Sequence, residues 1–129
     1  MAKIKVIKID VHSFTVNEIL IENNLESYYK EIGCTLVDRV AYDYNNDIVV
    51  DDEGLLKGET HFFRINDNLL AGNGLIMSVN NKGEWDNHSV DINEINEKIS
   101  FYKIFQKDGV ILTFKIPINI FSKSKNKSK

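Results

Sequence analysis

The sequence predicts an α+β fold, with a mostly antiparallel sheet of about six or seven strands and two short helices. Runs of β-branched and aromatic residues, bounded by turn-forming residues, predict the strands. Two short segments with apolar residues three and four positions apart predict the helices. The connections between consecutive strands are short, which favours antiparallel pairing.

The N-terminal part predicts two paired strands. Residues 3–9, K-I-K-V-I-K-I, place apolar residues close to a period of two, which is typical of a strand. A polar break at His12 and Ser13 follows, and then a second extended stretch with apolar residues at Phe14, Val16, Ile19 and Ile21. We expect these two stretches to form a hairpin.

A short helix is predicted next. Asn23 and Asn24 are suitable N-caps, because an asparagine side chain can accept a hydrogen bond from the first helical turn. Gly33 is suited to end the helix in a left-handed conformation. The apolar residues between these caps fall on one helical face: Leu25, Tyr28, Tyr29 and Ile32.

The middle of the chain predicts further strands around one aperiodic segment. Residues 34–42 and 47–51 are β-branched runs bounded by turn formers, so both are predicted as strands. Residues 55–68 show no clean period and are predicted as a loop with one helical turn at most. Residues 69–79 are predicted as a single buried strand.

A second helix is predicted near residue 92. Ser89 or Asp91 can cap it, and Asp91 followed by Glu94 has the spacing of a capping box. The apolar residues of this segment recur at spacings of three and four: Ile92, Ile95 and Ile99.

The C-terminal part predicts a hairpin at about residues 101–117. Asp108-Gly109 between two β-rich runs is the strongest short-range hairpin signal in the chain. We therefore expect one α+β domain over residues 1–121 and a flexible basic tail over residues 122–129. The apolar residues of the hairpin are candidates for an oligomer interface: Val110, Ile111, Leu112, Phe114 and Ile116.

Composition and charge narrow the function classes. The chain has no apolar run near the roughly 18 residues of a membrane-spanning helix, and no signal-peptide pattern at its start. Cys34 is a lone cysteine, so we expect a cytoplasmic protein without disulfides. Without the four lysines of the tail, the chain has 12 basic and 19 acidic residues, which gives a net charge of −7. This acidic body argues against duplex-DNA binding, and without a membrane-spanning run we expect no membrane partner.

The sequence offers no catalytic, metal or cofactor motif, so we expect a protein that is not an enzyme. His12, His61 and His88 lie far apart without a metal-ligand spacing, and a metal site would have to be assembled by the fold. Cys34 begins a strand of buried character, where cysteine usually acts as a small apolar residue. The acidic run Asp51-Asp52-Glu53 is interpreted as a solvated turn.

Six residues are candidates for ligand binding. His61, Phe63 and Arg64 lie in the aperiodic segment, where an imidazole, an aromatic ring and one of only two arginines are concentrated. Trp85 stands in a polar turn and must either fold back onto the core or meet a partner. The last two candidates are the glycines before the buried strand, which allow either a bulge or a close approach to a ligand: Gly72 and Gly74. For Phe63 a core position is the more common alternative.

These elements together resemble a family of small phage and prophage proteins of unknown function. The similarity covers about residues 3–95 and is carried by the strand K-V-I-K-I, the helix ending E-I-G, the segment D-D-E-G-L-L-K-G and the strand L-A-G-N-G-L-I-M-S-V. In that family the middle motif reads acidic-Glu-Gly, two variable residues, Lys-Gly and then an Asn-Arg pair. The family also has a proline near this pair; here E-T-H-F-F-R replaces both the proline and the Asn-Arg pair, and Arg64 alone is kept.

The resemblance implies a phage-encoded accessory protein that counters host defence without catalysis. The favoured route is sequestration of a nucleotide immune signal, of the cyclic nucleotide or ADP-ribose type, by a homo-oligomeric sponge. Arg64 would then meet a phosphate, Phe63 or Trp85 would stack on a base, and the amides near Gly72 and Gly74 would add donors. The alternative is an acidic inhibitor that occupies the nucleic-acid-binding groove of a host defence protein.

Overall fold

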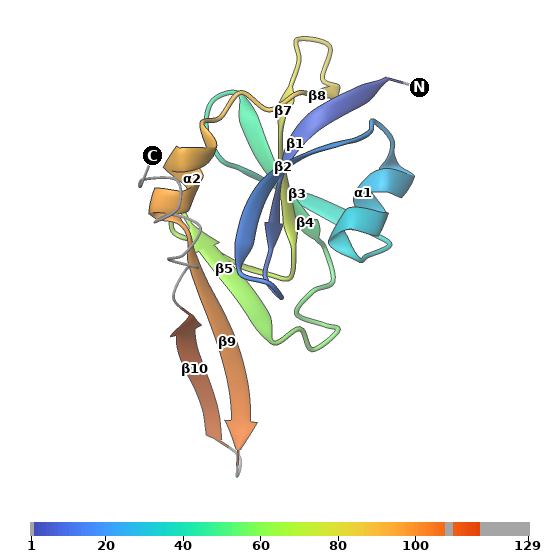
Figure 1. Cartoon of the computed structure of the whole chain (residues 1–129). Coiled ribbons are helices and arrows are strands. Elements are labelled where there is room, and N and C mark those ends of the chain that lie inside the picture. Colours follow the sequence, from blue (N-terminus) through green and yellow to red (C-terminus); the bar gives the residue numbers. More distant parts are fainter. Residues whose placement is uncertain (1, 108–109, 117–129) are drawn as a thin grey trace.

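The computed structural model describes residues 2–107 and 110–116, with side chains up to Phe105. It confirms the predicted α+β fold, and within the described part every strand pair is antiparallel (Figure 1). One sheet contains six strands: β1 (Lys3–Asp10), β2 (Thr15–Glu22), β3 (Val37–Ala41), β4 (Asn46–Asp51), β7 (Gly74–Val79) and β8 (Trp85–Asp86). The other contains four: β5 (His61–Ile65), β6 (Asn68–Ala71), β9 (Ser100–Lys107) and β10 (Val110–Ile116). Their orders are β2-β1-β7-β4-β3, with β8 added beside β7, and β10-β9-β5-β6.

The six-stranded sheet is the middle layer of the molecule, since both of its faces are buried. Because side chains alternate across a strand, Ile4 and Val6 of β1 point to one face, whereas Ile7 and Ile9 point to the other. The first face packs against helix α1 (Leu25–Ile32), and the second packs against the four-stranded sheet and helix α2 (Ile92–Lys98). This two-sided burial explains the consecutive apolar residues of β4 and β7.

Both helices begin at caps that the sequence predicted. The Asn24 side chain accepts a hydrogen bond from the Ser27 amide, and Gly33 ends α1 with a φ of 83°. Asp91 caps α2 by accepting from the Asn93 amide. The predicted capping box is not completed, because the Glu94 carboxylate accepts a hydrogen bond from the Tyr42 hydroxyl instead.

The prediction of a loop over residues 55–68 is wrong for its second half. Residues 61–65 form β5, which pairs with β6 through a turn at Asn66 and Asp67. Both turn residues have positive φ, 48° and 67°, a conformation that asparagine and aspartate tolerate better than most residues. The predicted single strand 69–79 is likewise divided into β6 and β7, with Gly72 at a φ of 81° between them.

The hairpin of β9 and β10 extends away from the rest of the molecule (Figure 1). The predicted turn residues Asp108 and Gly109, the side chains proposed as an oligomer interface and the basic tail lie outside the described residues. In the described part of the chain, no helix is long and apolar enough to cross a membrane.

Candidate functional site

The six residues nominated from the sequence do not converge on one site. His61, Phe63 and Arg64 share β5, but alternation along the strand directs Arg64 to the face opposite His61 and Phe63. Trp85 lies on β8, in the other sheet. A pocket that combines all of these side chains within one chain is therefore ruled out by the geometry.

Phe63 and Gly74 pack against each other in the core. The Phe63 side chain is fully buried, so it offers no ring face on which a nucleotide base could stack. A Cβ added at Gly74 would lie 2.9 Å from Phe63 Cζ, which shows how closely the ring approaches the backbone of β7. In the structure both residues contribute to the contact between the two sheets, and the burial of Phe63 speaks against the stacking role expected of it.

Trp85 folds back onto the core, one of the two alternatives left open by the sequence. Its indole meets Tyr28 of α1 edge to face, with ring centroids 5.1 Å apart. The indole Nε1 is buried without a hydrogen-bond partner among the described residues. Trp85 also lines an open pocket of about 340 Å³, whose other lining residues are Val37, Asp38 and Arg39.

That pocket places an arginine near the tryptophan, but the arginine is Arg39 and not Arg64. The Arg39 side chain is 60% exposed, and its guanidinium lies 3.7 Å from the Asp47 carboxylate. Arg64 is exposed on β5, away from the pocket's lining residues. If a nucleotide binds beside Trp85, Arg39 is the cation available to its phosphate.

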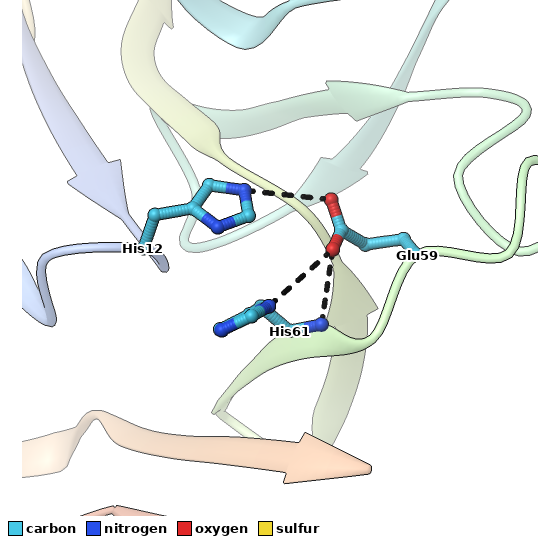
Figure 2. A group of neighbouring side chains, drawn as sticks. All are labelled: His12, Glu59 and His61. Atoms are coloured by element: carbon cyan, nitrogen blue, oxygen red, sulfur yellow. Dashed lines mark hydrogen bonds and ion pairs between the residues drawn. The ribbon is translucent and has the colours of Figure 1, made fainter. Parts of the chain in front are cut away.

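A second arrangement, which the sequence did not predict, joins His61 to His12 and Glu59. The Glu59 carboxylate lies beside both imidazoles, with Oε1 3.7 Å from His12 Nε2 and Oε2 3.7 Å from His61 Nδ1 (Figure 2). The ring centroids of His12 and His61 are 4.5 Å apart. Two nitrogens and a carboxylate oxygen within 4.8 Å of one another form a possible metal-ligand set.

Local hydrogen bonds hold the three residues of this cluster in place. Glu59 Oε2 accepts from the backbone N–H groups of Thr60 and His61, at 2.9 and 3.0 Å. Asp10 Oδ1 accepts from the His12 amide at 3.0 Å and fixes the turn between β1 and β2. The Asn73 side chain accepts from the amide of Val11, the residue before His12, and so ties this turn to the loop before β7.

Electrostatics favour a neutral His61. Burial lowers the pKa of His61, and the nearby His12 and Lys103 lower it further, against the opposite effect of the Glu59 carboxylate. A neutral imidazole keeps a nitrogen lone pair free for a ligand or a hydrogen bond.

Cys34 acts as a core residue. It is buried in the cluster between α1 and the larger sheet. Burial raises the pKa of its thiol, and the Asp51 carboxylate raises it further. The thiolate that nucleophilic chemistry needs is thus disfavoured.

The acidic turn at residues 51–58 exposes two large apolar side chains. Leu55 is 74% exposed and Leu56 86% exposed. The backbone around them is well hydrogen-bonded: the Gly54 and Lys57 amides donate to the carbonyls of Asp51 and Glu53. The Lys57 ammonium group also lies 2.7 Å from the Asp51 carboxylate. The two leucines are therefore exposed on a turn whose conformation is fixed by backbone hydrogen bonds and an ion pair.

A family model described as Domain of unknown function (DUF3846) matches residues 4–100. Neither a curated protein nor a solved structure matches the chain.

Proposed function

The chain belongs to the family Domain of unknown function (DUF3846). Since this membership implies no activity, we propose from the geometry of the chain that it is a non-catalytic protein that binds another protein through the acidic turn. The observation that carries this proposal is the exposure of Leu55 and Leu56 on that turn. Two adjacent leucines left in water on a hydrogen-bonded turn gain burial when a partner covers them, at about 25 cal/mol per Å² of apolar surface.

The partner's chemistry follows from the charges around the two leucines. Asp52 and Glu53 precede them on the turn, and the body of the protein is acidic. A complementary surface has an apolar pocket with a basic rim, such as the nucleic-acid-binding groove of a host defence protein. In this proposal the protein is a phage-encoded accessory protein that acts in the host cytoplasm and blocks such a groove.

The experiment compares a double variant of the turn with a matched exposed leucine elsewhere. Leu55→Ser with Leu56→Ser removes the apolar pair, and Leu20→Ser on β2 changes a leucine that is 58% exposed. A partner captured from host cells is then purified, and its affinity is measured for each variant. We expect the double variant to lose binding while Leu20→Ser keeps it, with affinity falling as salt is raised. Equal binding by both variants would exclude the acidic turn as the docking element.

A second candidate function is sequestration of a nucleotide immune signal, favoured by the pocket between Arg39 and Trp85. Its volume is at the lower end of the range of small-molecule sites, and it combines an aromatic edge with a guanidinium group. The pocket is open in the single chain, so a sponge of this kind requires a homo-oligomer that closes it.

The sponge is tested by a thermal-shift panel of cyclic dinucleotides, cyclic trinucleotides and ADP-ribose derivatives, with chromatography of the ligand afterwards. A ligand that binds the folded state raises the melting temperature and is recovered intact. Trp85 is the only tryptophan, so its fluorescence reports on this pocket directly. A flat panel with unchanged fluorescence would exclude the sponge and leave protein binding untouched.

A further inference from the structure

We propose that His12, Glu59 and His61 form a binding site for a divalent first-row transition-metal ion, for which Zn²⁺ is the probe. The donor set is the first reason. Two imidazole nitrogens with one carboxylate oxygen suit zinc, iron, cobalt and nickel, whereas Mg²⁺ and Ca²⁺ prefer sites made of oxygen alone.

The distances are the second reason. Ligand atoms about 2.0–2.2 Å from a metal at tetrahedral or octahedral angles lie about 3.0–3.5 Å apart. Each imidazole nitrogen lies 3.7 Å from a different oxygen of Glu59, and one ligand atom from each of the three residues lies within 4.8 Å of the others, so binding an ion draws the three side chains closer together. At 3.7 Å neither nitrogen is within hydrogen-bond distance of the carboxylate. The cluster therefore lacks the direct hydrogen bonds of an ordinary carboxylate and imidazole pair.

Preorganisation is the third reason. The backbone amides of Thr60 and His61 orient the Glu59 carboxylate, and Asp10 and Asn73 fix the turn that carries His12. These contacts hold the backbone of His12 and His61 and the carboxylate of Glu59, so the three ligands are ordered before an ion binds. One hydrogen bond must break when the ion binds. Thr60 Oγ1 lies 3.1 Å from His61 Nδ1, and the Thr60 hydroxyl has to rotate away when this nitrogen binds metal.

The surroundings leave room for an ion and for water. The His12 side chain is 57% exposed, whereas Glu59 and His61 are 23% and 17% exposed, so the site opens to solvent on the His12 side. Gly72 borders the carboxylate, since a Cβ added there would lie 3.6 Å from Glu59 Oε1. An ion held by three side chains on an open surface keeps positions for water or for a ligand of another molecule.

The test is calorimetric titration of the chelator-treated full chain with Zn²⁺, repeated with Co²⁺ to record the visible absorption of the bound ion. We expect one ion per chain. His12→Ala should weaken binding by at least about 10-fold, and Glu59→Gln should do the same. His12 is exposed, so its replacement leaves the core intact, and circular dichroism checks the fold of each variant. His12→Cys should restore binding, because a thiolate is also a zinc ligand.

The control removes the third histidine. His88 pairs with Glu18 on the larger sheet and is outside the cluster, so His88→Gln should bind Zn²⁺ like the wild type. Loss of affinity in His12→Ala and Glu59→Gln, with retention in His88→Gln, supports the site. The proposal is overturned if the wild type binds no ion, or if all three variants bind Zn²⁺ equally.

Discussion

The tip of the Phe63 ring, on β5 of one sheet, approaches Gly74, on β7 of the other, so closely that a Cβ added at the glycine would lie 2.9 Å from Phe63 Cζ. Gly74 pairs with Ile9 on one side and Val50 on the other, in the interior of the larger sheet. Glycine weakens the interior of a strand unless another group must approach closely, and the buried Phe63 ring of β5 is that group.

Gly74→Ala should lower the free energy of unfolding by about 1–3 kcal/mol, because the added methyl group overpacks the contact with Phe63. The new Cβ would lie 2.9 Å from Phe63 Cζ and 3.4 Å from Ile48 Cγ2. Urea denaturation measures the loss. Phe63→Leu makes room for the methyl group, so the double variant should be more stable than the sum of the single effects by at least about 0.5 kcal/mol.

Gly83→Ala is the matched control. Gly83 has a φ of 79° and no heavy atom within 4 Å of an added Cβ, so its replacement introduces backbone strain alone. Its effect should add to that of Phe63→Leu without coupling. Additive behaviour of Gly74→Ala with Phe63→Leu would contradict the close packing described here.

Both partners of this contact are ligand-binding candidates in the sequence, but a core position is the more common alternative for Phe63, and the structure shows that alternative. What the sequence could not predict is that Phe63 and Gly74 contact each other, for a physical reason. Local patterns place a residue on a strand or a turn, but the contact between β5 and β7 joins two different sheets. The strands with clear periodicity and the capped helices were predicted correctly. The β5 and β6 hairpin was missed because its strands are short and its turn, Asn66-Asp67, was read as part of a loop.

Trp85→Ala should lower the free energy of unfolding by about 2–3 kcal/mol, since it removes the edge-to-face contact with Tyr28 and leaves a partly filled space beside α1. Trp85→Phe keeps an aromatic ring and should lower the free energy of unfolding by less than Trp85→Ala. The measurement is chemical denaturation followed by circular dichroism, because the variants lack the only tryptophan. If Trp85→Ala left the free energy of unfolding unchanged, the indole would not stabilise the packing of α1.

Replacing Arg39 and replacing Arg64 should have different effects in a nucleotide-binding assay. Arg39→Ala and Arg64→Ala both change exposed side chains, so each should leave the stability within about 0.5 kcal/mol of the wild type. If a nucleotide raises the melting temperature, Arg39→Ala should abolish the shift and Arg64→Ala should retain it. The reverse result would move the site to β5 and restore the role first expected of Arg64.

The His12, Glu59 and His61 cluster marks the limit of prediction from sequence. Glu59 and His61 are neighbours in the chain, but the turn that carries His12 reaches them only when β1, β7 and β5 are assembled. Residues so far apart in sequence have no common spacing that a motif could describe. The sequence predicts no metal site, because the spacing of its histidines matches no ligand motif, yet the structure places two of the three, His12 and His61, side by side.

Asp43 should stabilise the protein in a pH-dependent way through the turn that precedes β4. Its Oδ1 accepts from the amides of Asn45 and Asn46, both at 2.8 Å, and from the buried Asn46 side chain at 3.0 Å. Burial raises the pKa of the Asp43 carboxyl, but the hydrogen bonds from Asn46 and Asn45 outweigh this effect and hold the pKa below its ordinary value. The carboxylate is thus favoured in the folded state.

Asp43→Ala should lower the free energy of unfolding by about 1 kcal/mol near neutral pH. This value is modest because the carboxylate is exposed and screened by water. A carboxyl group whose pKa is lower in the folded state stabilises the protein above its unfolded pKa, and this contribution is lost as the pH falls through the folded value. The stability difference between wild type and Asp43→Ala should therefore be constant above the ordinary aspartate pKa of 3.8 and shrink below it. Urea denaturation of both proteins at neutral pH and at successively lower pH measures this difference. A difference that grows on acidification would show that Asp43 does not act as the ionised acceptor of this turn.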